Sequence, residues 1–114
     1  MKLNHLNLTV TDPIATSEFL AKYFELCPGG GNGGMQMLND DNGLVLTLIK
    51  GRADAVTYPA TFHVGFILAS EPQVDAINAR LRQDGFKVDP PARLHGAWTF
   101  YFMAPGGFVV EVLC

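Results

Sequence analysis

The chain carries the same structural plan twice. Residues 3–10 and residues 62–68 each alternate apolar and polar side chains, which predicts two strands with one packed face each. A histidine lies on the polar face of both, His5 in the first segment and His63 in the second. Each of these strands is followed by a helix signal and then by further strand signals. Repetition of this kind predicts a duplicated supersecondary unit rather than one continuous fold pattern.

Helix signals follow both histidine strands. In the first half, Thr11 or Asp12 can cap a helix that we expect over Pro13–Glu25, with the proline in its first turn. In the second half, Ser70-Glu-Pro-Gln73 has the spacing of a capping box, and Gly85 suits the position that ends a helix. The apolar residues between these signals recur at helical spacing.

The remaining strands and loops complete each half. Asn42-Gly43 and Pro105-Gly106 are typical turn sequences, because glycine supplies the positive φ that tight turns need. We interpret Gly29–Gly34 as a flexible loop and possible lid rather than a phosphate cradle, and Asp89–Gly96 as a second loop. Strands are expected near the following segments: 35–38, 44–49, 98–103 and 107–114.

Both halves therefore match as strand, helix and three strands. We predict an α+β fold in which tandem βαβββ modules form a curved mixed sheet around a cleft. The modules span about residues 1–52 and 59–114, with a polar connector over 50–58, and together form one domain. At 114 residues and 48% hydrophobic, the chain can bury a core of its own.

The last strand contains one carboxylate, Glu111, in an apolar run. A buried carboxylate needs hydrogen-bond donors, a counter-charge or a metal. Aligning Gly43 with Gly107 sets Thr47 against Glu111, so three of the four repeat-equivalent positions can ligate a metal. Singly, a strand histidine or a terminal glutamate is more often structural. Together, His5, His63 and Glu111 form a two-histidine, one-carboxylate set with positions left open for substrate.

These segments also resemble a known family. The duplicated plan, with Leu-Asn-His5-Leu-Asn-Leu, Phe-His63-Val-Gly-Phe and Phe-Met-Ala-Pro-Gly-Gly-Phe-Val-Val-Glu111, is similar to the vicinal oxygen chelate superfamily over nearly the whole chain. That superfamily includes glyoxalase I, bleomycin-resistance proteins, extradiol dioxygenases and fosfomycin-resistance enzymes. The resemblance implies metal ligands at His5, His63 and Glu111. It also implies a homodimer, since members commonly build each cleft from two chains.

One position departs from glyoxalase I. That enzyme has a fourth, carboxylate ligand at the end of the first module, where this chain has Thr47, so the resemblance disfavours a methylglyoxal-type isomerase. Extradiol dioxygenases and fosfomycin-resistance enzymes use two histidines and one glutamate, as here. The chain ends three residues after Glu111 and lacks the basic tail of the fosfomycin-resistance enzymes. Extradiol enzymes carry a further acid–base histidine near the metal, a role for which His95 is the candidate.

Other candidate site residues are assigned by strand face or loop position. His95 and Tyr101 are our candidates for catalytic groups. Asn7, Thr47, Arg93 and Trp98 are our candidates for substrate contacts. The alternatives are structural: filling the concave side of a sheet for Asn7 and Thr47, and a plain loop followed by a core tryptophan for Arg93 and Trp98.

Net charge and cysteine content limit the classes of partner and the cellular location that we expect. The net charge is −3 and no cluster of Lys or Arg occurs, so the electrostatic signature of a nucleic-acid or anionic-membrane binder is missing. Neither a signal peptide nor an apolar run of membrane-spanning length is apparent. Two separated cysteines favour a reducing, cytoplasmic location.

The leading hypothesis is a small metal-dependent enzyme. A divalent Fe, Mn, Zn or Ni ion on the His-His-Glu set would chelate and activate a small, oxygen-rich substrate. The alternative is a metal-free binding protein of the bleomycin-resistance type, which would sequester an aromatic or cationic ligand.

Overall fold

The computed structural model describes residues 1–52 and 55–114, so residues 53 and 54 of the expected connector lie outside the described residues. Two compact units make up the chain: Met1–Tyr58 with Pro105–Gly107, and Pro59–Ala104 with Phe108–Cys114. Each unit contains one strand, one helix and three further strands that form a mixed four-stranded sheet. The predicted α+β fold built from two βαβββ modules is confirmed.

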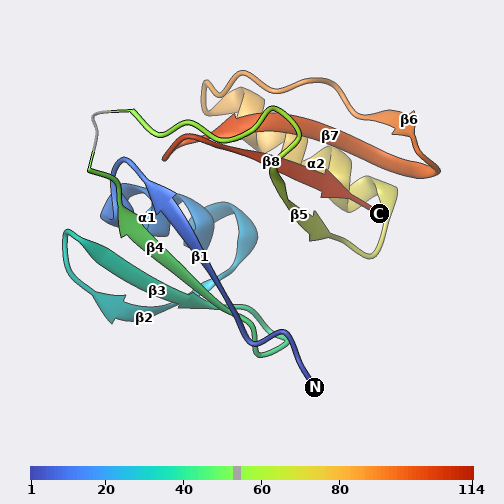
Figure 1. Ribbon diagram of the computed structural model, residues 1–114. Coiled ribbons are helices and arrows are strands. Elements are labelled where there is room, and N and C mark those ends of the chain that lie inside the picture. The colour runs from blue at the N-terminus through green and yellow to red at the C-terminus, as the bar shows by residue number, and fades with distance from the viewer. Residues whose placement is uncertain (53–54) are drawn as a thin grey trace. The chain divides into compact units, whose positions relative to one another are not determined.

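The sheet of the first unit has the strand order β1-β4-β3-β2, with α1 packed against one face (Figure 1). Its elements are β1 (His5–Val10), α1 (Pro13–Phe24), β2 (Cys27–Gly31), β3 (Met35–Asn39) and β4 (Val45–Lys50). Leu8, Leu38 and Leu48 of the strands and Phe19 and Leu20 of α1 are buried. The core of this unit therefore lies between α1 and the sheet, where each fully buried leucine contributes about 1.5–3 kcal/mol.

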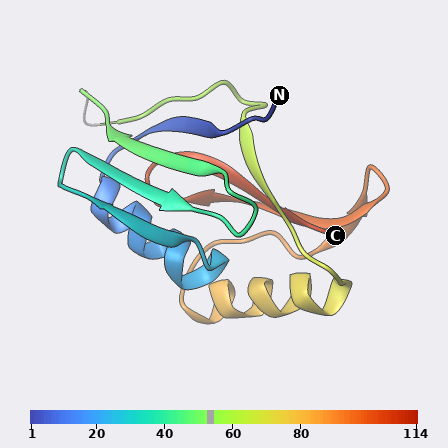
Figure 2. The same ribbon diagram turned by 90° about the horizontal axis from the view of Figure 1, so that it is seen from below.

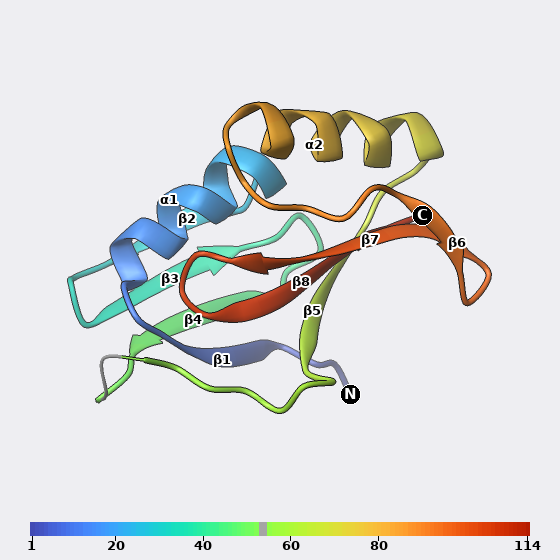
Figure 3. The ribbon, with the colours of Figure 1, turned by 90° about the horizontal axis from the view of Figure 1, so that it is seen from above.

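The second unit repeats this plan with the order β5-β8-β7-β6, and α2 lies along one face of its sheet (Figures 2 and 3). Its elements are β5 (His63–Ile67), α2 (Glu71–Gln83), β6 (Ala92–Leu94), β7 (Ala97–Ala104) and β8 (Phe108–Leu113). Phe100, Val110 and Val112 of the strands are buried with Val74 and Leu81 of α2.

Strand register confirms the predicted repeat alignment. β1 pairs with β4 in parallel and sets His5 beside Val45, while β5 pairs with β8 in parallel and sets His63 beside Val109. Thr47 and Glu111 each follow two residues after those valines, so they occupy equivalent positions. The third strand extends this equivalence to residues not aligned from the sequence: Met37 pairs with Thr47, and Tyr101 pairs with Glu111.

The N-caps predicted for the two helices differ in how far the structure confirms them. Asp12, rather than Thr11, caps α1, and its Oδ1 accepts a hydrogen bond from the Ala15 N–H at 3.1 Å. Ser70 is at the N-cap of α2 but makes no capping bond, and Gln73 Oε1 accepts from the N–H of Ala69 at 2.9 Å. The prediction of a capping box is therefore wrong: Ser70 makes no side-chain bond, and the Gln73 side chain bonds the N–H of Ala69 instead of that of Ser70.

The prediction of a loop over Gly29–Gly34 is wrong for its first three residues, which belong to the edge strand β2 (Cys27–Gly31) paired with β3. The register shifts between Pro28 and Gly30, as at a β-bulge. A Cβ at Gly31 would lie 2.1 Å from the carbonyl oxygen of Met35, so only glycine allows this approach of the two backbones. Gly30 and Gly31 therefore serve backbone pairing with β3.

The second predicted loop also contains a strand. Ala92–Leu94 forms β6, paired with β7, and only His95 and Gly96 connect the two strands. Their φ angles are 52° and 82°. Positive φ at both central residues is the pattern of a type I′ hairpin turn. Residues 92–96 are therefore a hairpin arm and its tip.

Two further features concern the first unit. The turn Pro105–Gly107 belongs to it, and the Thr11 N–H donates to the Gly106 carbonyl at 3.2 Å. At the outer edge of β1, the Tyr58 hydroxyl accepts from the Thr9 N–H and donates to the Thr9 carbonyl, both at 2.8 Å. No helix among the described residues is long and apolar enough to cross a membrane.

Candidate functional site

Glu111 occupies the middle of β8 with its side chain on the sheet face opposite α2. Its neighbours Val110 and Val112 are buried in the core against α2, and side chains alternate between the faces of a strand. Only 14% of the Glu111 side chain is exposed. A carboxylate so covered needs hydrogen-bond donors, and the adjacent strands supply them.

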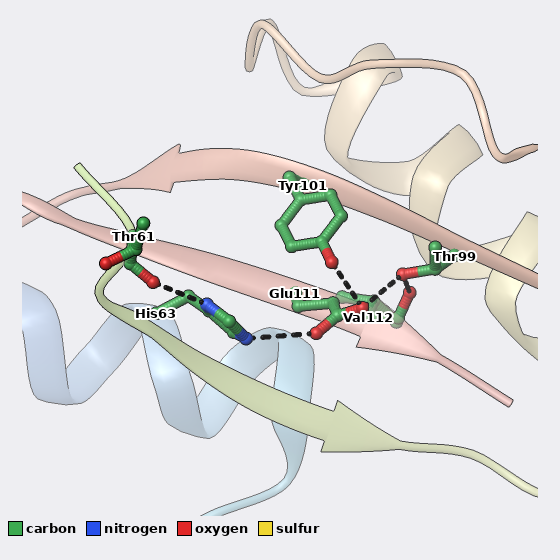
Figure 4. Close-up of polar contacts among 6 residues, drawn as sticks. All are labelled: Thr61, His63, Thr99, Tyr101, Glu111 and Val112. Atoms are coloured by element: carbon green, nitrogen blue, oxygen red, sulfur yellow. Dashed lines mark hydrogen bonds and ion pairs between the residues drawn. The ribbon is translucent and has the colours of Figure 1, made fainter. Parts of the chain in front are cut away.

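Two hydroxyl groups of β7 donate to one carboxylate oxygen (Figure 4). The Tyr101 hydroxyl lies 2.7 Å and the Thr99 hydroxyl 3.0 Å from Glu111 Oε1. Tyr101 is the direct register partner of Glu111, and Thr99 lies two residues away on the same face. Thr99 is 1% exposed, and its hydroxyl also lies 3.0 Å from the Val112 carbonyl oxygen. Glu111 Oε1 therefore has two hydroxyl groups within hydrogen-bond distance, one of which it shares with the Val112 carbonyl.

The second carboxylate oxygen faces an imidazole. His63 Nε2 lies 3.2 Å from Glu111 Oε2, and 41% of the His63 side chain is exposed. In β5 the residue directly beside Glu111 is Gly65, which has no side chain, so the space next to the carboxylate is open to His63 two positions earlier.

The other nitrogen of His63 determines which tautomer is present. Nδ1 lies 3.0 Å from the carbonyl oxygen of Thr61, and a carbonyl only accepts hydrogen bonds, so Nδ1 carries a hydrogen (Figure 4). A neutral His63 then has its lone pair on Nε2, directed at Glu111 Oε2. His63 Nε2 and Glu111 Oε2 therefore offer two ligand atoms of the types that divalent metals bind, 3.2 Å apart.

Tyr101 is a hydrogen-bond donor in this site. The hydrogen bond to Glu111, together with burial and the negative charge of that carboxylate, raises the pKa of the Tyr101 phenol above its usual value. Its ring meets the His63 ring edge-on, with centroids 5.7 Å apart and planes at 84°. The raised pKa keeps the phenol protonated, which suits a donor and not a general base.

The first unit carries the candidates His5, Asn7 and Thr47 on its sheet face opposite α1. Asn7 and Thr47 are direct register partners. His5 Nδ1 lies 3.0 Å from the Asn4 side-chain oxygen. Within neither unit, over residues 1–52 and 55–114, do three His, Cys, Asp or Glu side chains gather in a group able to hold a metal. The structure brings together His63 and Glu111 of the three predicted ligands.

Arg93 and Trp98 lie on the other face of the second sheet. The two residues are register partners, and the Arg93 guanidinium lies 5.4 Å from the Trp98 ring centroid. Arg93 pairs with Glu71, and Trp98 Nε1 donates to Asp75 Oδ1 at 2.8 Å. Both acidic partners belong to α2, so these two substrate candidates face the helix rather than Glu111.

His95 is exposed at the tip of the β6–β7 hairpin. Along β7, Ala97 is four residues from Tyr101, or about 13 Å at the rise of a strand. The structure therefore does not bring His95 to the Glu111 carboxylate. Thr99, by contrast, was not expected at the site from the sequence. Its place two residues before Tyr101 on one strand is the signal that identifies it.

Comparison with known proteins agrees with this architecture. The family model of the Glyoxalase/Bleomycin resistance protein/Dioxygenase superfamily matches residues 2–112. The chain belongs to this superfamily. No curated protein matches the chain. The superfamily assignment confirms the resemblance drawn from the two histidine strands and the last strand.

Solved structures give the same result. A possible glyoxalase from Bacillus cereus is 53% identical with a TM-score of 0.93, over 100% of this chain and 99% of that one. The oxidase ChaP-H2 is 28% identical with a TM-score of 0.80, over 99% and 92%. A lactoylglutathione lyase from Agrobacterium tumefaciens, at 19% identity and a TM-score of 0.78 over 98% and 92%, shares the fold.

Proposed function

We propose that the chain is a small metal-dependent enzyme in which His63 and Glu111 hold a divalent cation that binds neighbouring oxygens of a small substrate. The observation that carries this proposal is the 3.2 Å approach of His63 Nε2 to Glu111 Oε2. Both side chains have their other polar atom engaged, Nδ1 at Thr61 and Oε1 at Tyr101 and Thr99. His63 Nε2 and Glu111 Oε2 are thus the two atoms left to bind a cation.

These residues fit a metal in type as well as in placement. Metal-binding histidines usually donate their other ring N–H to a carbonyl or carboxylate, as His63 does to Thr61. Imidazole and carboxylate together suit Fe, Mn, Zn or Ni. The sequence repeat and the superfamily resemblance make His5 a candidate for a further metal ligand. A bound cation of this kind would polarise substrate oxygens as a Lewis acid.

Position 47 bears on the class of reaction. Threonine neither ligates a metal well nor acts as a base, and it is the repeat equivalent of Glu111. A two-histidine, one-glutamate set with open positions is the arrangement of non-haem oxygenases. We therefore favour an oxidase- or dioxygenase-type reaction, in line with the ChaP-H2 relative, over a glyoxalase-type isomerisation.

Metal content tests the proposal. Protein is prepared without affinity tag or chelator, incubated with Fe²⁺, Mn²⁺, Ni²⁺ or Zn²⁺ one at a time, and analysed by elemental mass spectrometry after desalting. We expect one ion per chain in the wild type and loss of that ion in His63→Ala. His95→Asn is the matched control, because it removes an exposed histidine at a positive-φ position that asparagine tolerates. A wild type that retains none of the four metals refutes the proposal.

One observation favours the binding-protein alternative. Ile67 and Met103, 78% and 62% exposed, lie on the same sheet face as Glu111, and such side chains suit an apolar ligand. Titration with metal-free bleomycin in excess EDTA, followed by amide NMR signals, tests it. Shifts confined to residues around Ile67 and Met103 support this alternative. A spectrum unchanged at millimolar ligand refutes it.

A further inference from the structure

The Glu111 carboxylate is held asymmetrically. Oε1 has two hydroxyl donors, at 2.7 Å from Tyr101 and 3.0 Å from Thr99. Oε2 has His63 Nε2 at 3.2 Å. A carboxylate oxygen accepts about two hydrogen bonds, and Oε1 has two hydroxyl donors within reach whereas Oε2 has none among the described residues. Any cation that Glu111 and His63 hold together meets Oε2.

The two donors differ in strength. Thr99 has one hydroxyl hydrogen but two acceptors at 3.0 Å, Glu111 Oε1 and the Val112 carbonyl, so it shares that hydrogen. Tyr101 has the shorter contact, and its ring packs edge-on against His63. Tyr101 is therefore the principal restraint on Oε1, and Thr99 the second.

The first unit shows what happens where the carboxylate is absent. The equivalents of Tyr101 and Glu111 are Met37 and Thr47. Met37 has no hydroxyl to donate, so the donor is missing in the same copy of the repeat as the acceptor. This pattern links the Tyr101 hydroxyl to the carboxylate rather than to the stability of the sheet.

We propose that Tyr101 and Thr99 are positioning residues that occupy Glu111 Oε1 and so make Glu111 a monodentate ligand through Oε2. The proposal rests on the metal-binding function proposed above. A bidentate glutamate takes two coordination positions, whereas a monodentate one takes one. The restraint therefore leaves one more position on the cation for the second oxygen of a chelating substrate.

Two hydroxyl deletions test the proposal without enzymatic turnover. Mn²⁺, Ni²⁺ and Zn²⁺ are titrated singly by calorimetry into the wild type, Tyr101→Phe, and Tyr101→Phe/Thr99→Val. Thr99→Ser is the matched control, because it keeps the hydroxyl and removes only a methyl group. Circular dichroism establishes that each variant is folded. Crystal structures of the metal-loaded wild type and double variant show how many oxygens of Glu111 bind.

We expect the double variant to bind about 10–100-fold more weakly, the usual cost of losing such supporting partners, and to bind through both carboxylate oxygens. Thr99→Ser should match the wild type in affinity. A double variant with wild-type affinity and monodentate Glu111 overturns the positioning role and leaves the metal-dependent function intact. A wild type that binds none of the three metals overturns both.

Discussion

Replacement of Gly106 by alanine tests how the turn between β7 and β8 is held. Gly106 has a φ of +105°, and its carbonyl accepts from the Thr11 N–H in the first unit. A Cβ built on Gly106 would lie 2.6 Å from Thr16 Oγ1 and 3.2 Å from Val10 Cγ1. Thr16 and Val10 are both fully buried, so neither has free space to move into.

Two costs add in Gly106→Ala. A non-glycine residue in a sparsely populated backbone region costs about 1–3 kcal/mol. Forcing an extra methyl group into a packed core costs about 1–3 kcal/mol more. We therefore expect the free energy of unfolding to fall by about 2–6 kcal/mol. A loss at the upper end would remove a large part of the stability of an ordinary domain.

Gly96→Ala is the matched control for the backbone cost. Gly96 has a φ of +82°, and a Cβ there meets nothing within 4 Å. It should lose only about 1–3 kcal/mol. Urea unfolding followed by circular dichroism measures both variants. If Gly106→Ala is no less stable than Gly96→Ala, the steric part of the reasoning is refuted.

Three further predictions concern single hydrogen bonds. Asp12→Ala should cost about 1 kcal/mol in urea unfolding, whereas Ser70→Ala should cost clearly less, because only Asp12 makes a side-chain capping bond; equal losses would contradict this. Because the pKa of Tyr101 is raised, its phenol should ionise above the usual pH in an ultraviolet titration. The free energy of unfolding that its hydrogen bond contributes should be complete below the ordinary tyrosine pKa, and it should be lost as pH rises through the raised pKa. Glu111→Gln should bring that titration back toward the ordinary value, and an unchanged titration would exclude the carboxylate as the cause. Thr99→Val should lower the free energy of unfolding by about 1–3 kcal/mol, because the half-buried Glu111 carboxylate loses one of its two hydroxyl donors and the Val112 carbonyl loses the Thr99 hydroxyl; a loss as large in Thr99→Ser would assign the effect to the methyl group.

Most of the fold follows from the sequence because its signals are local. Alternation in the histidine strands, the cap at Asp12 and the glycines at turns each depend on a few neighbouring residues. The βαβββ plan predicts three strands after each helix, but the positions of β2 and β6 were not predicted, because both are edge strands whose pairing depends on a neighbouring backbone. In β2, Pro28 and three glycines have poor strand propensity, and only the close approach of β3 to Gly31 explains the pairing.

The candidate site was predictable where strand alternation fixes the face. Tyr101 is the direct register partner of Glu111, and His63 lies two residues before Gly65, the partner of Glu111 in β5. All three side chains therefore share one sheet face. Trp98 begins the expected strand 98–103, three residues before Tyr101, and this odd spacing already predicts the opposite face, whereas Arg93 lies in a segment predicted as loop, where no alternation applies. The strand β6 and its tight turn set Arg93 beside Trp98 on the α2 side, a placement that depends on a hairpin not predicted from the sequence.

The Tyr58 hydroxyl at Thr9 limits how another chain can add to this one. β1 is an edge strand of its sheet, and exposed edges can pair with strands of other molecules. At Thr9 both backbone groups are already hydrogen-bonded to one phenol. Any strand that added along the outer edge of β1 would have to end before Thr9 or displace Tyr58, so this one side chain shortens the surface through which copies could aggregate.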